Sequence, residues 1–137
     1  MSFWLSHHRE DELHRAYDLG GGVRVCARCL GVYPVMFAAI AAQLATRAPL
    51  AWRWDAAWTL ALFAPAVMDW AVGRLAPSFG SNPWRTLTGT LAGLALGRSL
   101  YIHLQKPFPT WLLLQGAAVT AAALAVILTT YARRTAR

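Results

Sequence analysis

The sequence predicts an all-α membrane protein: four transmembrane helices in a compact bundle with an N-terminal cytosolic metal-binding arm. Hydrophobic residues make up 57% of the 137 residues and charged residues only 14%. That is too little charged surface to coat a water-soluble globule, which favours a lipid environment. Four long apolar runs follow one another along the chain, and the only two cysteines, Cys26 and Cys29, stand just before the first run.

The four apolar runs occupy residues 31–46, 54–72, 86–104 and 110–131. A bilayer core requires roughly 20 helical residues, and a lone strand would leave backbone groups unpaired in lipid, so each run is expected to be a helix. The breaks between them carry Arg, Lys and Pro. The predicted organisation is therefore an N-terminal arm over residues 1–30, a four-helix domain over 31–131 and a basic tail over 132–137.

Orientation follows from the Lys and Arg side chains that flank the runs, because cytoplasmic loops carry an excess of them. The arm, the second loop and the tail hold nine of these side chains, whereas the first and third loops hold three, Arg47, Arg53 and Lys106. We therefore expect a multi-pass protein of the bacterial inner (cytoplasmic) membrane with both termini cytoplasmic.

The formal net charge of +7 indicates attraction to anionic lipid headgroups. No recognisable nucleic-acid-binding module accompanies this charge. We expect membrane lipids as partners and no nucleic acid.

Cys26 and Cys29 form a C-x-x-C pair, a spacing that suits one metal ion or one disulfide. A cytosolic position argues against a standing disulfide, because cellular reductants keep thiols reduced. A tetrahedral zinc ion would need two more ligands. His7 or His8, with His14 as a substitute, could supply them if the chain folds back at the three glycines of residues 20–22. A redox pair and two small apolar side chains remain the alternatives.

Asp69 and Arg85 are the candidate catalytic residues. The predicted topology places the start of the first helix, the end of the second and the start of the third on one membrane face. A carboxylate near the end of a span is costly unless paired and often marks a functional position. Arg85 and Arg74 are the expected partners of Asp69, and the alternative is an ion pair that only joins two helices.

The segment from Gly80 to Arg85 has the pattern of a helix start. Asn82 is expected to cap the helix and Pro83 to occupy its first position. Free N–H groups at a helix N-terminus favour anions, so Ser81, Asn82 and Arg85 form a candidate site for a substrate phosphate or a lipid phosphate. Plain capping is the alternative.

Gly89, Gly93 and Gly97 form a stripe along the third helix. Glycine at every fourth position lets another helix approach closely, such as the alanine-rich fourth. The stripe predicts packing within the chain, or with a second copy or a larger membrane complex. Farther along, Arg98 is expected to extend to the interface, and Gln43 and Gln115 to join helices.

Two blocks of the sequence resemble a family of small bacterial integral membrane proteins catalogued as domain of unknown function 2085. Residues 25–33 are similar to the family's C-A-R-C-x-G-x-Y, and residues 81–93 to its S-x-N-x-x-R-x-x-T-G-x-x-x-G. The resemblance implies architecture and residues but no reaction.

Family members usually carry a Cys-His pair where this chain has His7-His8. Cys and His interchange as zinc ligands, whereas His cannot replace a thiol in disulfide exchange. The resemblance therefore implies a Zn²⁺ site built from His7, His8, Cys26 and Cys29. Two other functions remain as alternatives: a membrane thiol–disulfide oxidoreductase linked to a quinone, and an accessory or lipid-binding subunit of a larger membrane complex.

Overall fold

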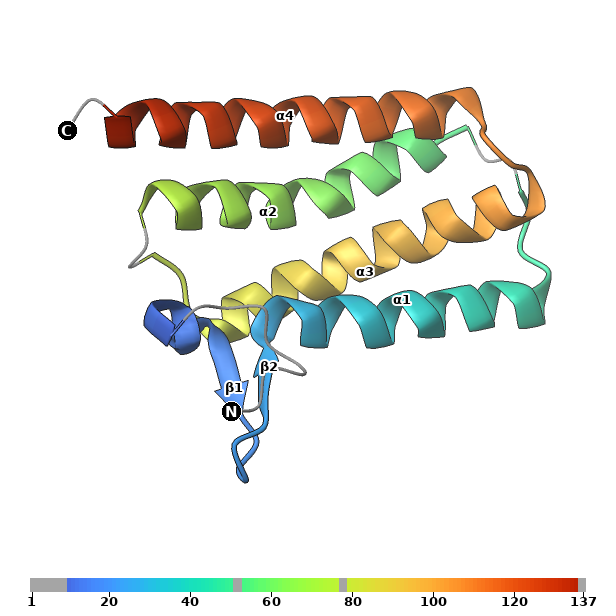
Figure 1. The fold of residues 1–137 in the computed structure, drawn as a ribbon. Helices are drawn as coiled ribbons and strands as arrows, with labels where there is room; N and C mark the ends of the chain where they lie inside the picture. Colours follow the sequence, from blue (N-terminus) through green and yellow to red (C-terminus); the bar gives the residue numbers. More distant parts are fainter. Residues whose placement is uncertain (1–9, 51–52, 77–78, 136–137) are drawn as a thin grey trace.

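The computed structural model describes residues 10–50, 53–76 and 79–135. Four long helices run side by side, and a short β-hairpin stands at one end of them (Figure 1). The elements in chain order are a 3₁₀ helix η1 (Glu10–Arg15), β1 (Ala16–Asp18), β2 (Arg24–Cys26), α1 (Ala27–Thr46), α2 (Asp55–Leu75), α3 (Asn82–Gln105) and α4 (Thr110–Thr135).

The bundle has a hairpin end, at which β1 and β2 lie, and a far end opposite to it (Figure 1). At the hairpin end α1 begins, α2 ends and α3 begins; at the far end α1 ends, α2 begins, α3 ends and α4 begins (Figure 1). The start of α1, the end of α2 and the start of α3 therefore lie at the same end of the bundle, as predicted. The helices start earlier or end later than the apolar runs, so that Cys26 is the N-cap residue of α1 and Cys29 lies in its first turn.

The arm folds back on itself, as its glycines predict. β1 and β2 pair antiparallel with Ala16 opposite Cys26. Gly20, Gly21 and Gly22 all have positive φ angles, a conformation that costs glycine little and other residues more. The amide of Gly20 donates to the Asp18 carboxylate at 2.9 Å, which closes the turn. The hairpin itself was not predicted, because its strands have only three residues each.

The glycine stripe of α3 packs against α1, and the expected partner α4 was wrong. A Cβ atom added at Gly89 would lie 2.5 Å from the Arg28 carbonyl oxygen, and one added at Gly93 would lie 2.6 Å from that of Val32. These distances leave room for hydrogen only, so the two backbones are in direct contact. Because α1 covers the stripe, a second copy or another subunit would have to dock on a different surface, and such docking stays a prediction.

Three of the four helices, α1, α2 and α4, are long and apolar enough to cross a membrane. The fourth predicted span, α3, is not, because its sequence contains two arginines and several Thr, Ser and Gly residues. It is nevertheless the helix with the most buried residues. Its 24 residues extend about 36 Å and join the hairpin end to the far end, alongside α1 and α2. The polar helix is thus shielded by its apolar neighbours.

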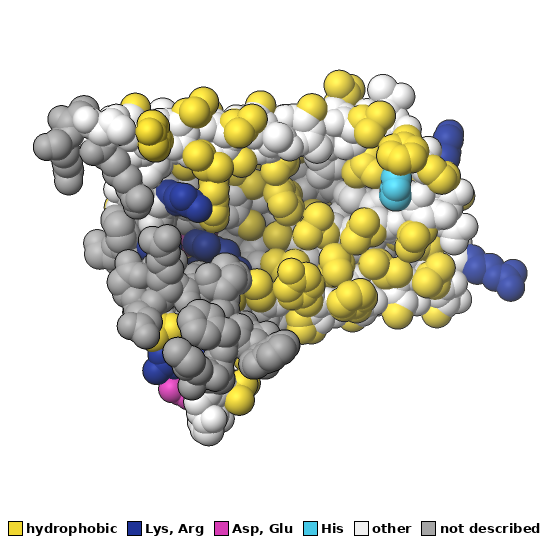
Figure 2. Space-filling model, in the orientation of Figure 1, with side chains coloured by type: hydrophobic (Ala, Val, Ile, Leu, Met, Phe, Trp, Pro, Cys, Tyr) yellow, Lys and Arg dark blue, Asp and Glu magenta, His cyan; other side chains and the backbone are white. Residues whose placement is uncertain are grey.

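Helix α4 lies against α2 and is largely exposed along its length. Hydrophobic side chains cover the visible sides of the bundle, while Lys and Arg lie toward its two ends (Figure 2). This distribution is typical of a membrane protein, in which the apolar girdle faces lipid and the charges face water.

Candidate functional site

The central contact at the hairpin end joins Arg28 of α1 to Asp69 of α2. Arg28 Nε donates to Asp69 Oδ2 at 2.6 Å, and Nη2 donates to the Asp69 carbonyl oxygen at 3.2 Å. Asp69 is only 4% exposed. The expected partners, Arg85 and Arg74, were wrong: the guanidinium of Arg74 lies over the Trp70 ring instead. The partner of Asp69 is the residue inside the C-x-x-C motif.

Arg85 is buried next to this pair. Its Nη2 donates to the Phe79 carbonyl at 2.8 Å and its Nη1 to Asn82 Oδ1 at 3.4 Å, whereas its Nε has no hydrogen-bond partner among the described residues. Gly80 separates Arg85 from Asp69: an added Cβ would lie 3.4 Å from Asp69 Oδ1 and 3.6 Å from Arg85 Nη2. The two candidate catalytic residues are therefore neighbours without a direct hydrogen bond.

Three contacts fix the arm to the helices around this site. Arg15 Nη2 donates to the Gly73 carbonyl at 2.9 Å, and Asn82 Nδ2 donates to the Ala16 carbonyl at 3.2 Å. Thr86 Oγ1 donates to the Ala27 carbonyl at 3.0 Å, which joins the first turns of α3 and α1. The hairpin is thereby held over Arg28, Asp69 and Arg85, which together are called the hairpin-end cluster.

Both cysteines lie beside the hairpin-end cluster, and neither forms a disulfide among the described residues. Cys26 is buried, with 2% of its surface exposed, and Cys29 is partly exposed and hydrogen-bonds with Cys26. His14 is exposed at the end of η1. Among the residues that the structure describes, no three His, Cys, Asp or Glu side chains are grouped to hold a metal ion, so His14 does not complete a set with the two thiols. His7 and His8 lie outside the described residues.

The start of α3 is capped by Ser81, not by Asn82. Ser81 Oγ accepts from the Trp84 amide at 3.4 Å, and the Ser81 carbonyl accepts from the Arg85 amide at 3.0 Å. Pro83 has no N–H, so few first-turn amides remain for an anion. The geometry agrees with capping. Binding of an anion or a lipid phosphate at Ser81, Asn82 and Arg85 stays a prediction, and the Arg85 guanidinium would have to supply most of the hydrogen bonds.

A second buried ion pair closes the far end. Arg98 of α3 binds Asp55 of α2 through two parallel hydrogen bonds, Nε to Oδ1 and Nη2 to Oδ2, both 2.8 Å. It also donates to Gln43 Oε1 at 3.0 Å and to the Pro49 carbonyl at 2.8 Å. Arg98 thus extends to the far end of the bundle, in agreement with the prediction, and is held there by Asp55 and by the connection between α1 and α2. Asp55 was not identified from the sequence. Its position at the start of an apolar run, level with Arg98 and Gln43 in the neighbouring helices, could have indicated this ion pair.

The chemistry open to Asp69 is restricted by its partner. One carboxylate oxygen already accepts from Arg28, and a charge-assisted pair of this kind holds the carboxylate in one orientation. That favours positioning of α1 against α2. Catalysis by Asp69 and Arg85 stays a prediction.

Comparison with known proteins agrees with this architecture. A family model described as "Predicted membrane protein (DUF2085)" matches residues 14–99, which include β1, β2, α1, α2 and most of α3. No curated protein and no solved structure matches the chain. The matched segment contains both cysteines and all three residues of the hairpin-end cluster. The chain therefore belongs to the DUF2085 family of predicted membrane proteins.

Proposed function

We propose that this membrane protein carries a zinc-type site at the cytosolic face of the inner membrane, with Cys26, Cys29, His7 and His8 as ligands. The observation that supports the proposal best is the place of Arg28. It stands between the two cysteines and is bound to the buried Asp69, so the turn that carries both thiols is held rigidly against α2.

Burial and the neighbouring thiol of Cys26 favour the protonated form of Cys29, so a bound cation would be required to hold both sulfurs as thiolates. The helix start acts in the other direction: Cys26 is the N-cap residue of α1 and Cys29 lies in its first turn, near the partial positive charge of the helix N-terminus. The guanidinium of Arg28 adds a positive charge nearby. Two thiolates that touch each other repel unless a cation lies between them, and Zn²⁺ supplies that cation.

The fold also brings the described part of the arm beside the thiols. Ala16 pairs with Cys26 across the hairpin, and η1 ends at Arg15, which is bound to α2. The 3₁₀ helix η1, which follows the two histidines in the chain, thus lies at the same end of the bundle as the thiols. Two histidines from this segment would complete a closed tetrahedral site.

A closed site has a structural role. Zinc binding in small sites provides about 10–16 kcal/mol at neutral pH, far more than a three-residue hairpin gains from its own hydrogen bonds. The metal would fix the arm over the hairpin-end cluster and so cover Asp69 and Arg85 from the aqueous side.

Burial argues against the thiol–disulfide alternative. Disulfide exchange requires a sulfur that a second thiol can reach; Cys26 is 2% exposed, so only the partly exposed Cys29 is within reach. Exchange at Cys26 would need the hairpin to open, although hydrogen bonds from Arg15 and Asn82 hold it in place.

The test is elemental analysis of the full-length protein purified in mild detergent without chelator. We expect close to one zinc per chain in the wild type and loss of zinc in Cys26→Ser, Cys29→Ser and the double variant His7→Ala/His8→Ala. His14→Ala and His103→Ala are the matched controls and should retain the metal. Zinc that survives the cysteine substitutions would contradict the proposal.

A further inference from the structure

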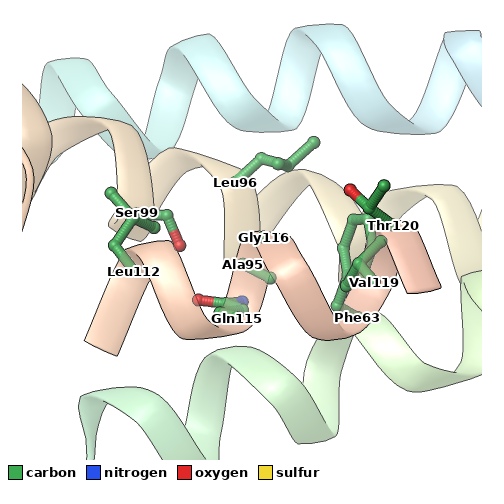
Figure 3. Close-up of a pocket in the computed structure, with 9 residues that line it drawn as sticks. All are labelled: Phe63, Ala95, Leu96, Ser99, Leu112, Gln115, Gly116, Val119 and Thr120. Atoms are coloured by element: carbon green, nitrogen blue, oxygen red, sulfur yellow. The ribbon is translucent and has the colours of Figure 1, made fainter. Parts of the chain in front are cut away.

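An apolar groove with buried polar groups lies between α2, α3 and α4. Its first part, a cavity of about 240 Å³, is lined by residues that include Phe63, Ser99, Leu112, Gln115 and Gly116 (Figure 3). A second cavity of about 290 Å³ shares the side chains of Phe63, Leu96 and Val119 with the first. It continues the groove toward Trp70 and Ala123. The two cavities lie next to each other along α4.

Polar groups gather in the first cavity only. Ser99 is 5% exposed, and its hydroxyl has no hydrogen-bond partner among the described residues. Gln115 lies at the same end of the cavity (Figure 3) and accepts from Thr59 Oγ1 at 3.3 Å, which leaves its amide nitrogen as a donor. A buried hydroxyl without a partner is costly. Two donors in an apolar cavity therefore call for a ligand with an acceptor oxygen.

The depth of these donors selects among lipids. Ser99 lies six residues before the end of α3, about 9 Å along the helix axis. If the 36 Å helix is centred on a hydrocarbon core of about 30 Å, Ser99 lies about 6 Å below the core boundary. The ester carbonyls of a diacyl lipid stay at that boundary, so they lie too high. A ring carbonyl embedded in the hydrocarbon layer lies at the right depth.

We propose that this groove binds a membrane quinone, a carbonyl-bearing ring on a long hydrocarbon tail. Apolar cavities of about 150 Å³ hold a benzene ring, so the first cavity has room for a six-membered ring with its carbonyl oxygens. Ser99 and Gln115 donate to one ring oxygen, and the tail follows the second cavity, whose lining is entirely apolar.

The site is independent of the thiols. Ser99 is 14 residues from Arg85 on α3, about 21 Å along the axis, so the first cavity, which would hold the ring, and the cysteines lie toward opposite ends of the bundle. The proposal is therefore one of binding, with no electron transfer to the cysteines, and it stands whether or not the zinc site does.

The test is a titration of the detergent-purified full chain with decylubiquinone, followed by quenching of tryptophan fluorescence, to which Trp70 in the second cavity contributes. We expect saturation at one quinone per chain. Ser99→Ala should weaken binding about three- to tenfold, the value of one hydrogen bond, and raise the melting temperature of the quinone-free protein by removing the unpaired hydroxyl.

The face of α4 provides a matched pair of variants. An added side chain at Gly116 meets open space, and Leu112, Gln115, Val119 and Thr120 on the same helical face also line the cavity. Gly116→Leu should fill the cavity and abolish binding, whereas Ala118→Leu on the other face should leave it unchanged. Quenching that does not saturate, or that is equal in both variants, would overturn the proposal. Equal displacement by dioleoyl phosphatidylglycerol would overturn it in favour of an ordinary ester lipid.

Discussion

Arg28 and Asp69, 41 residues apart in the chain, form a buried ion pair that fixes the C-x-x-C turn to the end of α2. The pair gives the motif a role that its spacing alone does not reveal. The arginine between the cysteines anchors their turn to α2, and the two cysteines are adjacent because they are three residues apart at the start of a helix. Arg98 and Asp55 form an equivalent pair at the far end.

Removal of one partner of the hairpin-end pair should be strongly destabilising. Arg28→Met leaves the Asp69 carboxylate buried without its cation, and a broken buried pair costs about 3–5 kcal/mol. The double variant Arg28→Met/Asp69→Leu should lose less than the two single variants together. Thermal unfolding in detergent measures this. The exposed pair of Arg24 and Asp18 is the control, and Asp18→Asn should change stability by less than about 1 kcal/mol.

Arg98→Lys should destabilise the far end even though the charge is kept. An ammonium group cannot donate to both Asp55 oxygens in parallel while it also reaches Gln43 and Pro49. We expect a loss of about 1–3 kcal/mol, the cost of unpaired buried acceptors. Arg53→Lys serves as the control, because its guanidinium only lies over the exposed Trp54 ring. Equal melting temperatures for the two variants would contradict the assignment.

The close contact of α1 and α3 predicts opposite effects for two Gly→Ala variants. At Gly93 the new methyl group would meet the Val32 carbonyl at 2.6 Å, so the helices must separate. The cost should exceed about 1 kcal/mol, as for other overpacked sites. At Gly116 the methyl group meets nothing within 4 Å. Gly116→Ala should therefore be neutral or gain up to about 1 kcal/mol from helix propensity. A destabilised Gly116→Ala or a tolerated Gly93→Ala would refute this packing.

Orientation in the membrane is testable by labelling of single cysteines introduced into a Cys26→Ser/Cys29→Ser background. Arg and Lys counts predict that Lys106→Cys, between α3 and α4, faces the periplasm, whereas Arg133→Cys at the end of α4 faces the cytosol. An impermeant maleimide should label the first in intact cells and the second only after lysis. The reversed pattern would place the cysteines on the oxidising side.

The sequence predicted the features that depend on composition and local pattern. Four helices, their approximate bounds, the glycine turn and the close packing of the Gly89–Gly97 stripe all follow from apolar length or from glycine spacing. The pairing of the charged residues did not follow. Asp69 binds Arg28 instead of Arg85, because the relative rotation of α1, α2 and α3 decides which side chains meet, and spacing within one helix does not encode it.

The least apolar helix was also misjudged. Residues 86–104 were predicted as a membrane span from their apolar length, but α3 is not among the three helices apolar enough to cross a membrane, and it buries Arg85, Thr88 and Ser99 among its neighbours. A helix that faces lipid must have a high hydropathy, whereas a helix that other helices shield from lipid can carry polar residues.

If the two cysteines share one zinc ion with two histidines of the arm, X-ray absorption at the zinc edge of the purified full-length protein will reveal both kinds of ligand. We expect two sulfur ligands at about 2.3 Å and two nitrogen ligands at about 2.0–2.1 Å. Protein without zinc, or zinc surrounded only by oxygen and nitrogen, would contradict this proposal.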